Sequence, residues 1–369
     1  MRRVRRIIQR QHLSSKILTQ FLIRAALRMV GDAEVILIMD STRCLRWEIF
    51  TLGVMIGGRV LPVAWAILPY PWPRGKFTPN AVALVNRALA CWPKDRPVHL
   101  LADRGFPSLK LFRALDRWRQ SLPLHYTIRL RAGDWVRMEN RQSVRMADLM
   151  SGITTGTWNT YRASYQHRGQ AGAPTLLVVG RGVPMYPAHQ MGPADQARRR
   201  AREERRVVHL LSKGQGRAPK TDTIWALLST ACDRTQAVQR YSLRFSTEGT
   251  YRDLKSWGLE AVADHETDIE HLDRLIGLAA LGYAIQAVVG AEAGRATEGQ
   301  ARARQQQWTT TDRLSVFWRG RQVIHDRAHD WRSWLSETLE QLAHRLAPEE
   351  SPTNQFCQSP TPNQTLEAA

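Results

Sequence analysis

The chain has 369 residues, which is long enough for a catalytic domain together with a sizeable insertion or a second small domain. It carries 53 lysines and arginines against 33 acidic residues, so a polyanion, and nucleic acid first of all, is the expected partner. A solvated basic surface or a membrane-facing patch is the alternative. Four widely separated cysteines without a Cys-x-x-Cys pair argue against a zinc site and indicate reduced thiols in the cytosol.

One segment partly resembles an export signal and another partly resembles a membrane span, but both contain polar residues that argue against these roles. The basic start, Met1 to Arg6, is followed by IIQRQHLSSK, whose polar residues break the apolar region that a signal peptide needs. The longest apolar helical run, Leu275 to Val289, contains Tyr283 and Gln286 and is shorter than a membrane span. We therefore expect a cytoplasmic protein with no membrane partner.

The first third of the chain alternates between helical and strand-like patterns. Asp40 directly follows one apolar run and Asp103 directly follows another, so each is expected at the carboxyl end of a strand. Gly57 and Gly58 separate two β-branched-rich runs and suit a hairpin with positive φ angles. The expected elements are a helix at 14–30, a strand at 33–39, paired strands at 47–56 and 59–68, a helix at 80–92, a strand at 98–102, a helix at 107–118 and a strand at 125–130.

This order of strand, hairpin, helix, strand, helix and strand predicts an α/β fold with a mixed sheet flanked by helices. It resembles the RNase H-like fold, in which two carboxylates stand on neighbouring strand ends. Ligands of open α/β sheets commonly bind at the carboxyl ends of strands, which is where Asp40 and Asp103 are expected.

The composition and the length of the expected elements change after residue 130. After residue 130 short strand-like pieces alternate with glycine, proline and a basic stretch, Arg198 to Arg206, which is either a binding segment or a solvated helix face. We expect a short helical N-terminal remnant at 1–30, the first part of an RNase H-like core at 31–130, a β-rich insertion at 131–218, the second part of the core with a helix that carries Glu248 at 219–320, a C-terminal helix at 321–346 and a disordered tail at 347–369.

Asp40 and Asp103 are candidate metal ligands. Cleavage of a phosphodiester by two metal ions needs acidic side chains that hold the ions roughly 3.5 to 4 Å apart. Hard carboxylate oxygens suit Mg²⁺, which takes the substrate phosphate as a further ligand. For either aspartate alone, an Asp that caps a turn at a strand end is the commoner explanation.

A late helical segment, 235–259, carries a stripe of functional side chains. At 100° per residue, one face presents a carboxylate among cations and a phenol, within an arc of roughly 80°. A lone glutamate among cations is usually a surface ion-pair ladder. Here Glu248 supplies the third ligand that a two-metal site requires, while the cations can neutralise phosphates. The residues of the stripe are Tyr241, Arg244, Glu248, Arg252 and Lys255.

The spacing Tyr-x2-Arg-x3-Glu-x6-Lys at Tyr241, Arg244, Glu248 and Lys255 resembles the signature of insertion-sequence transposases of family four. The resemblance extends to Asp40-Ser-Thr after an apolar strand and to the motif Leu101-Ala-Asp-Arg-Gly-Phe106, and it covers roughly residues 30–320.

This resemblance implies a DDE transposase with an RNase H-like core, in which Asp40, Asp103 and Glu248 are the catalytic metal ligands. Mg²⁺ is the implied cofactor, with Mn²⁺ as a substitute, and the implied partners are double-stranded transposon ends and target DNA, bound by a homodimer at the nucleoid of a prokaryote. The implied DNA-binding residues are Tyr241, Arg244, Arg252, Lys255 and Arg104.

The family also implies a tryptophan that stacks on a flipped base, with Trp135 and Trp158 as candidates and an ordinary core or surface role as the simpler interpretation. Only 39 residues precede Asp40, fewer than the family's N-terminal domain normally occupies, so recognition of the transposon end is an open question.

Three hypotheses for the function follow from these residues. The first is cut-and-paste transposition, in which water attacks the transposon end and the freed 3′ hydroxyl then attacks target DNA. The second is a truncated or catalytically silent remnant that only binds DNA, which the short N-terminus favours and the three acids disfavour. The third is a nuclease of the same fold that cuts DNA without joining it.

Overall fold

The structure is a computed structural model, and it describes residues 15–154, 157–181, 224–231, 233–256, 268–303 and 316–326. The expected basic stretch, the tail and most of the expected C-terminal helix lie outside these residues. The described elements are α2 (Ser15–Val30), β1 (Val35–Cys44), β2 (Trp47–Ile56), β3 (Arg59–Pro69), α3 (Phe77–Leu89), β4 (Val98–Ala102), α4 (Leu109–Trp118), β5 (Leu124–Arg129), β6 (Trp135–Met138), β7 (Ser143–Arg145), α5 (Met146–Ser151), β8 (Trp158–His167), β9 (Gln170–Ala171), β10 (Thr175–Arg181), β11 (Ile224–Ser229), α7 (Arg234–Ser242), the 3₁₀ turn η2 (Leu243–Phe245), α8 (Ser246–Ser256), α10 (Ile269–Ala303) and α11 (Val316–Asp326).

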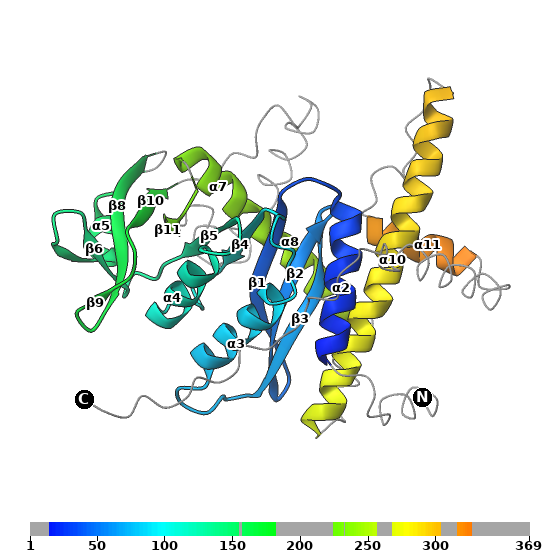
Figure 1. The fold of residues 1–369 in the computed structure, drawn as a ribbon, viewed down its shortest axis with the longest axis horizontal. Helices are drawn as coiled ribbons and strands as arrows, with labels where there is room; N and C mark the ends of the chain where they lie inside the picture. The colour runs from blue at the N-terminus through cyan, green and yellow to red at the C-terminus, as the bar shows by residue number, and fades with distance from the viewer. Residues whose placement is uncertain are drawn as a thin grey trace, which may run out of the picture. The chain divides into compact units, whose positions relative to one another are not determined.

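The described strands form one mixed sheet, which confirms the predicted α/β class (Figure 1). The strand order along the sheet is β3-β2-β1-β4-β5-β11-β10-β8-β6-β7, with β9 paired to β8. The pairs β1–β2 and β2–β3 are antiparallel, whereas β1–β4 and β4–β5 are parallel. The carboxyl ends of β1, β4 and β5 therefore lie on the same edge of the sheet.

Alternate residues of the central strands belong to cores on opposite faces of the sheet. In β1, Val35, Leu37 and Met39 join the main core, whereas Ile36 and Ile38 join a smaller cluster. This split follows from the two-residue period of a strand, and it explains why the strand is apolar without interruption.

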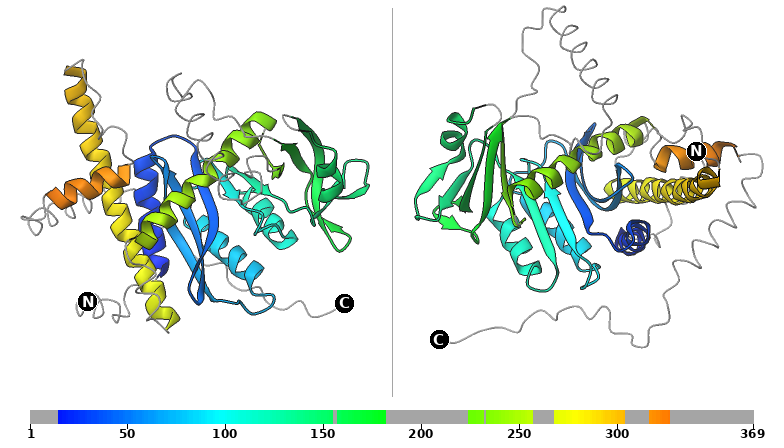
Figure 2. Two further views of the ribbon diagram at one scale, coloured as in Figure 1. Left: turned by 180° about the vertical axis from the view of Figure 1, so that it is seen from behind. Right: turned by 90° about the horizontal axis from the view of Figure 1, so that it is seen from above.

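Helices cover both faces. The main core on one face includes residues of α2, α3, α4 and α10, while α7 carries residues of a separate cluster with β10 and β11. Seen from above, α7 and α8 run along one side of the sheet and α3 and α4 lie on the other (Figure 2). This arrangement leaves the segment from α7 to α8 as the cover over one face of β1 and β4.

The first strand differs from the sequence expectation. The apolar run predicts a strand that ends before Asp40, but β1 continues to Cys44, so the prediction that Asp40 ends the strand is wrong. The added residues pair with β2, where Asp40 stands opposite Thr51. Hydrogen bonds to an antiparallel partner extend the strand past its apolar part, and no local pattern reveals that partner. Asp40 is nevertheless the first residue after the last β1–β4 pair, Met39 with Ala102.

The strands between residues 135 and 181 continue the same sheet. β11 pairs with β5 on one side and with β10 on the other, and β10 in turn pairs with β8. The short strand-like pieces expected after residue 130 include β8 and β10. The β-rich segment is thus joined to the core strands by backbone hydrogen bonds.

The long helix α10 packs beside α2 and β3 (Figure 1). Its stretch Ile269–Gly290 is long and apolar enough to cross a membrane by length and composition, a test that a core helix also passes. One face of this stretch is buried in the main core, through Leu272, Ile276, Ala280, Tyr283, Ala284 and Ala287.

The β2–β3 hairpin gives a prediction about backbone strain. Gly58 has a φ of +78°, and a Cβ added there would meet no atom within 4 Å. The substitution Gly58→Ala should therefore cost about 1 kcal/mol through the left-handed backbone alone. A matched control is Gly282→Ala within α10, where a Cβ also meets nothing and which should stabilise the fold by up to about 1 kcal/mol. Urea denaturation measures both changes, and equal signs would contradict the prediction.

Candidate active site

Asp40 and Asp103 lie on the face of the sheet that α7, η2 and α8 cover. Asp40 is two residues after Ile38 and four after Ile36, so it lies on the same face of the sheet as these residues, which pack beneath this helical segment. Asp103 is likewise two residues after Leu101, which belongs to the same cluster. A change of one residue in the register of β1 would place the Asp40 side chain on the opposite face, in the main core. The period of the strand therefore decides which face carries the acids.

Two side chains from the 241–247 segment contact Asp40. Arg244 Nη1 and Thr247 Oγ1 each donate a hydrogen bond to Asp40 Oδ2 over 2.8 Å, and the Ser41 backbone N–H donates to Oδ1 over 2.9 Å. The side chains of Asp40 and Arg244 are 14% and 8% exposed. The ion pair is therefore largely removed from water, so neither partner is easily replaced by solvent.

Tyr241 contacts the second aspartate. Its hydroxyl donates to Asp103 Oδ1 over 3.2 Å, while its ring is fully buried against Trp225 and Phe245. Burial raises the pKa of Tyr241 above its ordinary value, so the phenol stays protonated and remains a donor. Tyr241 and Arg244, both members of the predicted stripe, thus hold the two aspartates from the same segment.

Burial and the neighbouring charges have opposite effects on the pKa values of Asp40 and Arg244. Burial raises the pKa of Asp40 and the Asp103 charge adds to this, whereas Arg244, Thr247 and the Ser41 N–H lower it. Burial acts against the charge on Arg244, but Tyr241 and the two aspartates outweigh it and raise the pKa of Arg244. Arg244 therefore remains charged and compensates two acids that repel each other.

The predicted stripe divides into a buried and an exposed part. A continuous α-helix predicts one face for all five residues, but η2 interrupts it and adds about 20° of rotation per residue. Tyr241 and Arg244 are buried, whereas Glu248 and Arg252 are exposed. The backbone of Lys255 lies in α8, and its side chain is outside the described residues.

The donor set agrees with a divalent cation only in part. Two carboxylates from neighbouring strands offer the hard oxygen ligands that Mg²⁺ prefers, and each oxygen has more than one lone pair. Among the residues that the structure describes, no group of three or more His, Cys, Asp or Glu side chains is placed to hold a metal ion. The structure thus brings Asp40 and Asp103 to the same helical segment and leaves Glu248 on the solvent side of α8.

Sequence reasoning missed the residues that hold α8 on the sheet. Thr247 contacts Asp40, the Tyr251 hydroxyl lies 2.6 Å from Thr51 Oγ1, and Thr250 Oγ1 accepts the Val60 backbone N–H over 2.9 Å. Thr247 and Tyr251 follow Arg244 at helical spacing, which is the one signal that could have identified them.

The remaining predicted residues lie at the surface. Arg104 is exposed in the turn after Asp103, and its carbonyl accepts a hydrogen bond from Arg131 Nε. Trp135 is 47% exposed at the start of β6. Trp158 is half-buried, and its ring packs over Gly180, where an added Cβ would come within 2.1 Å of it.

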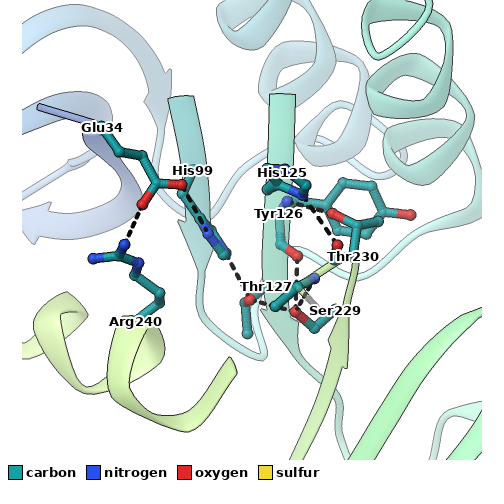
Figure 3. Close-up of polar contacts among 9 residues, drawn as sticks. Glu34, His99, His125, Tyr126, Thr127, Ser229, Thr230 and Arg240 are labelled. Atoms are coloured by element: carbon teal, nitrogen blue, oxygen red, sulfur yellow. Dashed lines mark hydrogen bonds and ion pairs between the residues drawn. The ribbon is translucent and has the colours of Figure 1, made fainter. Parts of the chain in front are cut away.

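A buried polar network supports α7 beside the site (Figure 3). The Glu34 carboxylate forms an ion pair with Arg240, the residue before Tyr241, and lies 3.8 Å from His99 Nδ1. His99 Nε2 is 2.8 Å from Thr127 Oγ1, which is 2.7 Å from Ser229 Oγ. The network ties three strands to the last turn of α7, so it fixes the approach of Tyr241 to Asp103.

No protein-family model and no curated protein matches this sequence, so its function is inferred from this site and from the motifs in the chain.

The Asp40–Arg244 pair predicts strong energetic coupling. Replacing Arg244 by Gln leaves a buried carboxylate without its cation, which should cost about 3 kcal/mol of unfolding free energy. The double variant Asp40→Asn with Arg244→Gln should lose about 1 to 3 kcal/mol less than the sum of the single changes. Chemical denaturation of all four proteins measures the coupling, and additivity within about 0.5 kcal/mol would show that the pair does not interact.

His99 predicts a loss of stability on acidification. Burial lowers the pKa of His99 against the opposing effect of Glu34, and His125 and Arg240 lower it further. Below about pH 6.5, this histidine takes up a proton in the unfolded chain but stays neutral in the folded chain. The free energy of unfolding therefore decreases as the pH falls.

The variant His99→Gln, which keeps a hydrogen-bonding group for Thr127, should lose less stability than the wild type between pH 7.5 and pH 5.5. Because pH 5.5 lies about one pH unit below the ordinary pKa of histidine, the difference should be at most about 1.4 kcal/mol over this range. Thermal denaturation across this pH range tests it, and parallel curves for the two proteins would refute it.

Proposed function

We propose that the chain is a DNA transposase of the DDE type that cuts and joins DNA strands in a Mg²⁺-dependent reaction at Asp40, Asp103 and Glu248. The observation that carries the proposal is the convergence of the two aspartates on Arg244 and Tyr241. Asp40 lies in β1 and Asp103 directly follows β4, and their partners Arg244 and Tyr241 are residues of the four-residue signature found in the sequence.

The strand order supports an RNase H-like core. The five strands β3-β2-β1-β4-β5 form a mixed sheet, with β1 antiparallel to β2 and parallel to β4, and such a sheet is what an RNase H-like core would require. Asp40 and Asp103 lie on the face covered by α7 and α8, next to the edge of the sheet at which the parallel strands end. Fold alone does not define a function, so the residues at this edge carry the argument.

Each side chain has a role in the proposed chemistry. Arg244 compensates the charge of the two aspartates and holds Asp40 in place, while Tyr241 orients Asp103. The exposed Arg104 and Arg252, together with Lys255, would bind backbone phosphates and carry no sequence information. Mg²⁺ held by Asp40, Asp103 and Glu248 would activate the attacking oxygen and stabilise the leaving oxygen.

The reaction has two displacements at phosphorus. Water attacks the phosphodiester at the transposon end, its P–O bond forms as the bond to the 3′ oxygen breaks, and the 3′ oxygen leaves as a hydroxyl after taking a proton. That hydroxyl then attacks a target phosphodiester, and the displaced target 3′ oxygen takes the proton. No oxidant or reductant is required, and a homodimer would hold both ends.

A second candidate is a DNA-binding protein that no longer cuts. The exposed position of Glu248 favours it, since a third ligand is not assembled among the described residues. Catalytic contacts often tighten only when substrate binds, so this geometry is also compatible with the enzyme.

Cleavage of a duplex that carries the inverted repeat flanking the gene tests the proposal. Wild type with Mg²⁺ should cut the DNA, and Asp103→Asn and Glu248→Gln should each lower the rate at least about a hundredfold, because several kcal/mol of transition-state stabilisation is lost. The control Glu270→Gln removes an exposed carboxylate, 75% exposed, whose ion pair with Arg274 contributes little. Undiminished cleavage by Glu248→Gln would remove that residue from the site.

Joining of the cut 3′ end to a target plasmid distinguishes a transposase from a nuclease. Salt-sensitive DNA binding without cleavage by the wild type would favour the binding protein instead.

A further inference from the structure

Two adjoining hollows lie on the part of the sheet that follows β5. The larger has a volume of about 460 Å³ and lies beside β8, the start of β10 and the end of β11. It is lined by Arg119 and Arg162 together with the hydroxyl residues Thr160, Thr175 and Thr230. The smaller, about 210 Å³, shares Arg162 and Pro174 with it and is also lined by Arg137 and Arg141. Because the two hollows adjoin at Arg162 and Pro174, they are here treated together and called the arginine groove.

The charge of the arginine groove is strongly one-sided. Four arginines line it, namely Arg119, Arg137, Arg141 and Arg162. Within the part of the chain that the structure describes, Glu139 is the one acidic residue in the lining. Arg119 lies 3.7 Å from Asp116, a partly exposed pair that contributes little. Arg162 and Arg141 are exposed. A concave basic surface attracts anions and concentrates them locally.

The strands place the arginine groove away from the two aspartates. β11 runs antiparallel to β5, so the end of β11 at Ser229 points to the edge opposite the carboxyl end of β4. Thr230 and Ala231, which follow β11, line the larger hollow. The groove is thus a basic surface separate from the site of Asp40 and Asp103.

The chemistry of the lining fits phosphodiesters. A guanidinium presents planar donors that match phosphate oxygens, and a hydroxyl supplies a further donor. Duplex DNA carries one negative charge per roughly 1.7 Å of its axis, so several arginines along one surface can contact successive phosphates. A small phosphorylated molecule offers the same oxygens to fewer arginines.

We propose that the arginine groove binds the phosphate backbone of duplex DNA, as a contact separate from the one at the aspartates. The proposal deepens the proposed function, because it names a second region through which the same DNA is held. Contacts to phosphates are independent of sequence, so the groove would strengthen binding to every duplex alike.

The test measures binding of a short duplex to the full-length protein without divalent metal, at several salt concentrations. The double variant Arg119→Gln with Arg162→Gln should weaken binding for any sequence. It should also reduce the slope of log affinity against log salt by roughly 1.8, or about 0.9 for each lost contact. The matched control is Arg24→Gln with Arg28→Gln, which removes the same charge from exposed positions on α2, beside β3 at the far edge of the sheet.

The outcomes separate the alternatives. A lowered slope for the groove variant and an unchanged slope for the control support the groove. Equal losses in both double variants would overturn the proposal, because they would show a diffuse effect of net charge. Unchanged DNA binding with loss of titratable inorganic phosphate binding would also overturn it in favour of a small anion.

Because the assay contains no metal and follows no cleavage, it is independent of the cutting reaction. A protein that binds DNA through the groove but does not cut would refute the proposed enzyme and leave the groove intact. Folding of each variant is checked by its thermal transition, and Arg162→Lys, which keeps the charge, should retain most of the salt slope.

Discussion

The contact on which the site depends is the buried ion pair of Asp40 and Arg244. A carboxylate and a guanidinium that are both largely withdrawn from water are costly unless each compensates the other. The pair joins the middle of β1 to the turn between α7 and α8, and Thr247 adds a second bond to the same oxygen. The placement of this helical segment over the sheet therefore determines the geometry of both aspartates.

The rest of the helical cover follows from that contact. Tyr241 precedes Arg244 by one turn and reaches Asp103, while Arg240 beside it is held by Glu34. The 3₁₀ turn lets the segment bend between its two contacts, so that α7 packs over β11 and α8 over β3. Glu248, the acid that completes the signature, follows this turn and lies at the surface.

A single sheet carries two charged sites with different chemistry. At the aspartates, Arg244 is buried and compensates acids of the protein itself. In the arginine groove, the cations are largely exposed and outnumber the acids, so their charge remains available to an external anion. The pairing of β11 with both β5 and β10 connects these sites through one continuous set of hydrogen bonds.

The sequence by itself determined the elements whose pattern is local. The strand before Asp103, the glycine pair of the hairpin and the helix expected at 107–118 all follow from apolar period and turn chemistry, and the structure confirms these elements, with the helix at Leu109–Trp118. The mixed sheet also followed, because a hairpin and two later strands admit few arrangements.

Only the tertiary structure decided that β1 extends past Asp40, that Thr247 binds it, and that Glu248 faces solvent. These features depend on the pairing of β1 with β2 and on the 3₁₀ turn between α7 and α8. A local sequence pattern reveals neither, because a prediction from helical period treats the helix as uninterrupted.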